Sequence, residues 1–310
     1  MTKITVLMNC LNGEAFVRDA IDSVYAQTFA DWEIVFWDNA STDSTAQIAL
    51  SYDSRLRYFR SAETVPLGQA RQWALAEARG EWLTILDHDD AFLPQRFERQ
   101  IAALDAGDFS MSYCGYNEMD ADGKILRAVL PRYKSGPLLN ELLVDYEINV
   151  ATVMMRREYL ARIDAAAVAS FKMAEEYYYY LSLAAMGPVC VVPEILTNYR
   201  QVDSSWSERV PERLSIEILE TLDLLERDRP GTAARYADGF AHARARAGYA
   251  NAKYLMRQGR YGEAHKAMAA IRHMRRLYGI LYVVSYVPPL WTLLHKRSVK
   301  ARLTGVFLGT

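Results

Sequence analysis

The feature that most constrains the fold of this chain is a short apolar segment, residues 82–86, followed at once by carboxylates. Thr84 is the one polar residue in it, and turn-forming residues flank it, so it is typical of a buried strand in a parallel sheet. Three aspartates, Asp87, Asp89 and Asp90, come within the next four positions. In open α/β sheets, ligands bind outside the carboxyl ends of the strands. The sequence therefore predicts an α/β fold with a binding site after this strand.

These aspartates indicate a site for a hard divalent cation. If the backbone stays extended, Asp87 and Asp89 point the same way and form a two-carboxylate clamp for Mg²⁺ or Mn²⁺. Such an ion keeps open positions that substrate phosphates usually fill. The alternative is a helix N-cap, because a helical stretch begins near Pro94 and acids favour helix starts. A cap needs one acid, a role that suits Asp90, and three unneutralised carboxylates would repel one another, which favours the metal site.

Strand and helix patterns alternate along the first hundred residues, which predicts a doubly wound, mostly parallel sheet. Asn12 is expected to cap the first helix, and Ser41 or Asp43 the second. The expected strands are 4–8, 33–37, 56–59 and 82–86, and further helices are expected at 69–78 and 95–104.

The pattern changes after residue 105. Asp122-Gly123 predicts a hairpin turn between strands at 109–116 and 125–130. Further strands are expected at 150–155 and 189–192, with a tyrosine-rich helix before the last of these. From about Pro211 the chain is expected to be all helical. We therefore divide the chain into an α/β domain, 1–207, whose pattern changes after residue 105, and a helical, basic C-terminal region, 208–310.

Several classes of protein are excluded or disfavoured. The first strand is followed by Asn9-Cys10-Leu11-Asn12-Gly13, which lacks the G-x-G-x-x-G of a dinucleotide-binding fold, and the chain has no P-loop motif. The three cysteines are far apart, which suggests structural thiols in a reducing compartment. The N-terminal residues lack the pattern of a signal peptide, so we expect a cytoplasmic protein.

Taken together and in order, the motifs of this chain resemble those of family 2 glycosyltransferases with the GT-A fold. The resemblance covers about residues 4–207. It implies a catalytic domain, 1–207, with a nucleotide-binding half, 1–105, and an acceptor half, 106–207. It rests on the first strand ending in Asn12, Asp38-Asn39-Ala40-Ser41-Thr42-Asp43, Gly68-Gln69-Ala70-Arg71, Leu86-Asp87-His88-Asp89-Asp90, Glu175-Glu176 and Tyr199-Arg200.

The resemblance implies roles for individual residues in binding a nucleotide-sugar donor. Asp38 would bind the nucleobase, since a carboxylate just past a strand end can accept a hydrogen bond from a ring N–H. Asn12 would belong to the same donor site, and Arg71 would lie near the nucleotide and its diphosphate, because a guanidinium matches phosphate geometry. Asp89 would bind the metal, with Asp87 on the ribose or sharing the ion.

Sugar transfer with inversion also needs a base to take the proton of the acceptor hydroxyl. In the family this is an acidic pair before an aromatic helix, and the match places Glu176 in that role, with Glu175 as the second candidate. The alternative is that these acids merely favour a helix start. Tyrosines 177–180 and Trp206 could stack on sugar rings; only some of the tyrosines can face the site, so Trp206 is the acceptor-side candidate.

The C-terminal region is strongly basic. Residues 240–310 carry 13 Lys and Arg against one acid, Glu263. Within it, residues 277–294 are uncharged but interrupted by Pro288-Pro289, with basic residues on both sides. The length reaches that of a spanning helix, yet the prolines and basic flanks favour a segment in a membrane interface, and packing against the protein is the other alternative. We expect residues 272–302 to bind an anionic membrane surface, and no nucleic acid, since no binding motif accompanies the charge.

The sequence thus predicts a metal-dependent, inverting glycosyltransferase, peripheral on the cytoplasmic membrane face, that moves a sugar from a nucleotide-sugar to a hydroxyl of a glycan or lipid-linked acceptor. The alternatives are a sugar nucleotidyltransferase, whose Gly-rich phosphate loop is missing here, and a non-catalytic nucleotide-sugar-binding or membrane scaffold protein.

Overall fold

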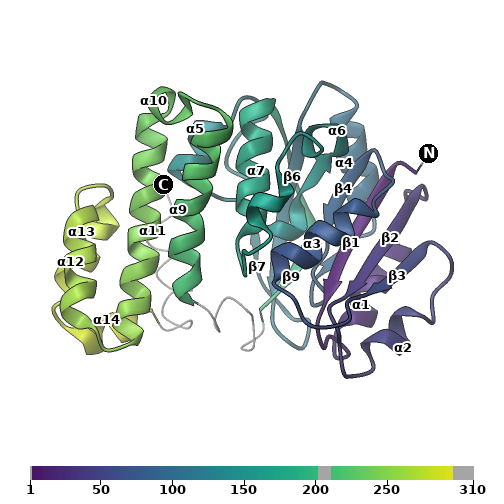
Figure 1. Ribbon diagram of the computed structural model, residues 1–310, viewed down its shortest axis with the longest axis horizontal. Coiled ribbons are helices and arrows are strands. Elements are labelled where there is room, and N and C mark those ends of the chain that lie inside the picture. The colour runs from purple at the N-terminus through teal and green to yellow at the C-terminus, as the bar shows by residue number, and fades with distance from the viewer. Residues whose placement is uncertain (1, 202–210, 296–310) are drawn as a thin grey trace.

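A nine-stranded mixed sheet with helices on both faces forms one side of the molecule, and a group of helices forms the other (Figure 1). The computed structural model describes residues 2–201 and 211–295. Along the sheet the strand order is β3-β2-β1-β4-β8-β6-β9-β5, and β7 pairs with the second half of β6.

The first four strands are parallel and confirm the predicted alternation of strand and helix. Residues of β1 are buried along its whole length, as expected for a strand that is covered on both faces. The register places Ile4 of β1 opposite Trp32 of β2 and Trp82 of β4. The elements of this half are β1 (Ile4–Cys10), α1 (Val17–Tyr25), β2 (Trp32–Asp38), α2 (Thr45–Ala49), β3 (Leu56–Arg60), α3 (Leu67–Ala76) and β4 (Trp82–Ile85).

The rest of the sheet mixes parallel and antiparallel pairs. β8 joins the two halves, because it lies antiparallel to both β4 and β6, while β9 lies parallel to β6. The elements are β5 (Ala91–Phe92), α4 (Arg96–Leu104), β6 (Met111–Met119), β7 (Ile125–Val129), α5 (Leu139–Val144), η1 (Val150–Thr152), β8 (Met154–Arg156), α6 (Arg157–Leu160), η2 (Ala165–Val168), α7 (Glu175–Met186) and β9 (Val189–Arg200).

Three local predictions can be compared with the structure. The hairpin turn at Asp122-Gly123 is confirmed, with Gly123 at φ 83°. The strand expected at 150–155 is wrong over its first half, which is a 3-10 helix whose start is capped by the Asn149 side chain. Asn12 does not cap a helix: its own φ is 55°, and α1 begins only at Val17.

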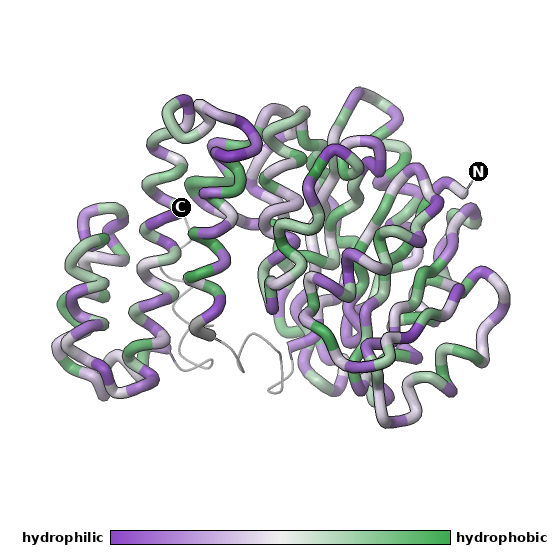
Figure 2. The backbone as a smooth tube through the Cα atoms, in the orientation of Figure 1, coloured by the Kyte–Doolittle hydropathy of each residue, from purple (hydrophilic) through white to green (hydrophobic). Residues whose placement is uncertain are grey.

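The C-terminal region is helical, as predicted, and its inner helices share a core with the sheet. Ile218, Leu222 and Leu225 of α9 pack in the same cluster as the buried side of α7. Figure 1 shows α9 and α11 standing between α7 and the outermost helices, and green and purple alternate along both in Figure 2, as in amphipathic helices. The helices are α9 (Pro211–Asp228), α10 (Thr232–Arg235), α11 (Ala237–Arg257), α12 (Tyr261–Ile271), α13 (Arg276–Val284) and α14 (Pro288–Leu294).

A single glycine allows α3 to approach the segment before α7. The backbone N–H of Gly68 donates to the Phe171 carbonyl at 3.0 Å, and a Cβ on Gly68 would lie 2.1 Å from the Val168 carbonyl oxygen. The Val168 carbonyl is too close to leave room for a side chain at this position.

We therefore predict that Gly68→Ala lowers the free energy of unfolding by about 1–3 kcal/mol, because the new methyl group must push backbone apart. Chemical denaturation measures this directly. Gly262→Ala, where a Cβ would meet nothing within 4 Å, is the control and should leave stability unchanged or raise it. Equal stability of Gly68→Ala and the wild type would show that α3 does not pack as described.

Candidate active site

Arg71 on α3 brings together acids that the sequence analysis selected from two separate segments, the loop after β4 and the start of α7. Its Nη2 donates to Asp87 Oδ1 at 2.7 Å, and its Nη1 forms an ion pair with Glu175 and lies 3.5 Å from Glu176 Oε2. The arginine is only 4% exposed. Burial lowers the pKa of Arg71, but the three carboxylates outweigh this effect and raise it, so the guanidinium remains charged.

The loop after β4 turns instead of staying extended. The N–H of Asp90 donates to the Asp87 carbonyl at 3.1 Å and closes a turn through His88 and Asp89. The argument that Asp87 and Asp89 point the same way, which assumed an extended backbone, therefore fails. Both side chains are nevertheless partly exposed, whereas Asp90 is buried. Burial, together with the charge of Asp87, raises the pKa of Asp89.

Asp90 is not the helix cap that we expected. Its Oδ1 accepts the backbone N–H of Arg200 at 2.8 Å, while α4 begins after Gln95 with no side-chain cap. The Arg200 side chain in turn donates from Nε to the Asp89 carbonyl at 2.9 Å and from Nη1 to the Ala121 carbonyl at 2.9 Å. Arg200 thus holds the aspartate loop against the end of β9. The sequence analysis selected Arg200 as part of the Tyr199-Arg200 motif, but it did not predict that this residue holds the aspartate loop.

Glu175 and Glu176 begin α7 but differ in how far solvent reaches them. The Glu175 side chain is fully buried against Arg71, and that of Glu176 is 22% exposed. Burial and the neighbouring Glu175 raise the pKa of Glu176 to about 8. Burial also raises the pKa of Glu175, while Arg71 opposes the shift. A partly exposed carboxyl with a pKa in this range is suited to exchanging a proton with a ligand near neutral pH.

Asp38 lies at the end of β2, as predicted, with a fully buried carboxylate that has several partners. Oδ1 accepts the Ser41 N–H at 2.7 Å, and Oδ2 accepts from Tyr58 Oη and Arg60 Nη1, both at 2.6 Å. Asn12 connects the β1–α1 loop to the same region, since its Oδ1 accepts the Thr42 N–H at 2.8 Å. The two residues therefore belong to neighbouring loops at the carboxyl ends of β1 and β2.

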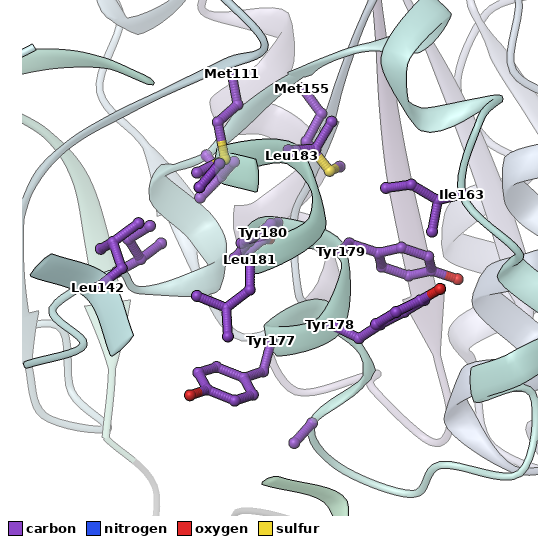
Figure 3. Packing of buried hydrophobic residues seen from close by; sticks show 14 of the residues in the cluster. Met111, Leu142, Met155, Ile163, Tyr177, Tyr178, Tyr179, Tyr180, Leu181 and Leu183 are labelled. Carbon is purple, nitrogen blue, oxygen red and sulfur yellow. The ribbon is translucent and has the colours of Figure 1, made fainter. Parts of the chain in front are cut away.

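The tyrosines that follow the acidic pair are core residues. Tyr177, Tyr178, Tyr179 and Tyr180 are each at most 5% exposed, and Figure 3 shows them among the buried side chains around α7. The Tyr178 hydroxyl is bonded to Asp228 of α9, and the Tyr177 hydroxyl to Arg246 of α11. Sugar stacking on these rings is therefore excluded by burial. The acceptor candidate Trp206 lies outside the described residues.

The residues after β4 fit a cation that is shared with a substrate. In the part of the chain that the structure describes, no group of three or more His, Cys, Asp or Glu side chains could hold a metal ion by itself. Asp87 and Asp89 supply hard carboxylate oxygens, and Arg71 occupies only Oδ1 of Asp87. Two carboxylates with substrate phosphates form the kind of ligand set in which Mg²⁺ usually binds.

Comparison with known proteins places the chain among glycosyltransferases. Residues 5–163 match the family model described as "Glycosyl transferase family 2". An uncharacterised glycosyltransferase of Rickettsia typhi is 28% identical over 65% of this chain and 64% of its own length, and one of Rickettsia felis is matched over only 22% of its length. An Escherichia coli protein, "UDP-Glc:alpha-D-GlcNAc-diphosphoundecaprenol beta-1,3-glucosyltransferase WfgD", is 28% identical over 66% of this chain and 79% of its own.

Two solved structures share the fold. TarS 1–349 of S. aureus in complex with UDP-GlcNAc has a TM-score of 0.58 and 15% identity, covering 98% of this chain and 92% of TarS 1–349. The mannosyltransferase PcManGT of Pyrobaculum calidifontis, in complex with GDP-Man and Mn²⁺, has a TM-score of 0.60 and 17% identity, covering 99% of this chain and 88% of its own.

We predict that Arg71→Met lowers the free energy of unfolding at neutral pH by about 3–5 kcal/mol, because it leaves the Glu175 carboxylate buried without a partner. The pKa of Glu175 is already raised by burial in the folded wild type and lies higher still in the variant, so the loss relative to the wild type should grow as the pH rises from the folded-state pKa of the wild type towards that of the variant. Chemical denaturation across this pH range measures both effects.

The matched control is Arg79→Met, which removes an exposed arginine just beyond the same helix and should change stability by less than about 0.5 kcal/mol. A loss for Arg71→Met that is small, or that does not depend on pH, would contradict the role of the arginine as the partner of a buried carboxylate.

Proposed function

The chain belongs to glycosyl transferase family 2 and is a glycosyltransferase of the GT-A fold, and we propose that it transfers a sugar, with inversion, from a nucleotide-sugar to an acceptor hydroxyl, using Glu176 as the base. The observation that supports this most is the meeting of Asp87, Glu175 and Glu176 at the Arg71 guanidinium. Family membership also favours transfer over the nucleotidyltransferase and scaffold alternatives.

Burial distinguishes between the two candidate bases. Glu175 is fully enclosed with Arg71, so an acceptor hydroxyl cannot reach it, whereas Glu176 is partly exposed. In our proposal the Glu176 carboxylate accepts the proton of the acceptor hydroxyl as that oxygen attacks the anomeric carbon and the nucleoside diphosphate leaves. Glu175 is then the buried counter-charge of Arg71, and its negative charge helps to keep Glu176 basic.

The donor would lie across the carboxyl ends of β1, β2 and β4. We assign Asn12 and Asp38 to the nucleoside end, Asp87 to the ribose or the metal, and Arg71 to the region near the diphosphate. The Asp38 carboxylate is fully buried and already bonded to Ser41, Tyr58 and Arg60, so in this proposal the base meets it only where Tyr58 or Arg60 gives way. Donors named for similar proteins are UDP-Glc, UDP-GlcNAc and GDP-Man, and we propose a donor of this class.

We assign a divalent cation, Mg²⁺ or Mn²⁺, to Asp89 with Asp87. When bound, such an ion neutralises the charge of a leaving diphosphate. The protein itself supplies the turn after β4 that carries both residues, and Arg200, which fixes the Asp89 carbonyl and Asp90. Both contacts hold the loop in place without occupying the Asp89 carboxylate.

We further propose that the outer helices bind an anionic membrane surface, where a glycan or lipid-linked acceptor would be found. No helix within residues 2–201 and 211–295 is long and apolar enough to cross a membrane. In α13 and α14 the buried side chains, such as Leu281 and Trp291, pack inward. The exposed large hydrophobic side chains of this segment are Leu277, Ile280, Val283, Tyr286, Val287, Leu290 and Leu293.

These seven make up about half of the fifteen strongly exposed large hydrophobic side chains among the described residues. The sequence after Glu263 contains no acid, and Arg272 and Arg276 are exposed beside the apolar side chains. An apolar face with basic neighbours fits the interface of a membrane with anionic lipids. The E. coli relative is named for a diphosphoundecaprenol-linked acceptor, which supports the lipid-linked alternative.

We predict that Glu176→Gln lowers kcat by about 10²–10⁴-fold while donor binding remains, because the amide cannot accept the acceptor proton. In the wild type, kcat/KM should rise with pH through the Glu176 pKa of about 8, since the base acts only when deprotonated. Initial rates between pH 5.5 and 9.5 test both statements. The exposed Glu158→Gln is the control, and a variant at Glu176 with wild-type turnover would rule out this base.

Donor binding should depend on the metal. We expect UDP-glucose, UDP-N-acetylglucosamine or GDP-mannose to raise Tm by a few degrees with Mn²⁺ or Mg²⁺ and little in EDTA. Asp89→Asn should abolish the metal-dependent part of the shift, whereas Asp122→Asn, in the exposed hairpin turn, should not. A shift of equal size in EDTA would show that the aspartates do not act through a cation.

Membrane binding can be measured by sedimentation with vesicles. The wild type should bind vesicles containing phosphatidylglycerol more strongly than pure phosphatidylcholine, and Ile280→Ser with Val283→Ser should weaken binding by at least tenfold. Ile125→Ser with Leu126→Ser, an equally exposed apolar pair on β7, is the control. Absence of wild-type binding to anionic vesicles would contradict the proposed surface.

A further inference from the structure

Glu217 on α9 is a fully buried carboxylate whose partners lie mainly in another part of the chain. Oε1 accepts the backbone N–H of Lys172 at 2.8 Å, and Oε2 accepts those of Met173 and Ala174 at 3.1 and 2.9 Å. Arg213, one turn earlier on α9, donates from Nε to Oε1 at 3.1 Å. A buried carboxylate that accepts three backbone N–H groups and one guanidinium N–H is well compensated.

The three N–H groups belong to the residues that immediately precede α7. Ala174 is the N-cap residue of this helix, and no side chain of its own segment caps it. Glu217, from the C-terminal region, instead accepts the N–H groups that lead up to the helix and places its negative charge at the end of the helix where such a charge is favoured. The next two residues are Glu175 and Glu176. The Glu217 carboxylate therefore fixes the backbone position from which the acidic pair begins α7.

The same segment is held at its other end by α3. The Gly68 N–H donates to the Phe171 carbonyl at 3.0 Å, three residues before Arg71 along the helix. The stretch from Phe171 to Ala174 is therefore fixed between the helix that carries Arg71 and the helix that carries Glu217. Its position determines the distance between the guanidinium and the Glu175-Glu176 pair.

We propose that Glu217 is a positioning residue for the transfer reaction: by holding the backbone of residues 172–174, it sets where Glu176 meets the acceptor hydroxyl. This inference rests on the proposed role of Glu176 as the base. It assigns the C-terminal helical region a part in the chemistry that is separate from membrane binding. A displacement of the base by a fraction of an ångström affects turnover more than donor binding, because the donor is held by other residues.

The test is Glu217→Gln, which keeps the shape of the side chain but turns an NH₂ group towards the backbone donors. Hydrogen exchange at the amides of residues 172–174 should become at least tenfold faster, and exchange elsewhere on α7 should change little. With the nucleotide-sugar that stabilises the wild type most among the three named above, kcat should fall by tenfold or more while the donor KM changes less than twofold. The rise of kcat/KM near pH 8 should also shift.

Glu220→Gln, one turn further along α9, is the matched control, since this side chain lines an open surface pocket of about 470 Å³. If Glu217→Gln does not fold, Arg213→Met weakens the same contact from outside and should give smaller changes in the same direction. Normal exchange at 172–174, or a fall in kcat no larger than that of Glu220→Gln, would overturn the proposal. A wild type without transfer activity but with slow exchange at these amides that Glu217→Gln accelerates would instead overturn the proposed function alone.

Discussion

The ion pair between Arg71 and Glu175 is the contact on which the rest of the site depends. Both groups are buried, so either charge alone would destabilise the folded protein, and the ion pair offsets this destabilisation. Because Arg71 also holds Asp87, the pair connects α3, the loop after β4 and the start of α7 in one cluster. Glu176 is the one carboxylate of the adjacent pair that solvent reaches, and its pKa is raised by its own burial and then by the charge of Glu175 beside it.

The C-terminal helices are structurally part of this arrangement. The Tyr177 and Tyr178 hydroxyls reach Arg246 and Asp228, and Glu217 holds the backbone before α7. The inner helices α9 and α11 thus hold α7 in place, while the outer helices α13 and α14 present apolar side chains to solvent. If these outer helices lie on a membrane, packed helices connect the lipid surface to Glu176. The site would then stand at a fixed distance from the bilayer that holds the acceptor.

The sequence was sufficient for elements that depend on local patterns and insufficient for contacts between distant segments. The buried strand before Asp87 and the helix with Arg71 follow from apolar spacing, and the acidic pair that begins α7 follows from its resemblance to a family motif. That Arg71 and Glu175 form an ion pair could not be predicted, since 104 residues separate them. Glu217 was missed because an acid on an amphipathic helix ordinarily faces water. The prediction of an extended backbone from Asp87 to Asp89 was wrong, because a four-residue turn is marked in a sequence only by its residue types.

The most direct measurement of the central claim is the protonation of Glu176 itself, followed by carboxyl ¹³C NMR on protein labelled at glutamate, with Glu176→Gln used for assignment. The account predicts a resonance that titrates near pH 8 in the wild type and at still higher pH in Arg71→Met, where the neighbouring cation is gone. A Glu176 resonance that titrates near pH 4.5 and is unaffected by Arg71→Met would contradict it.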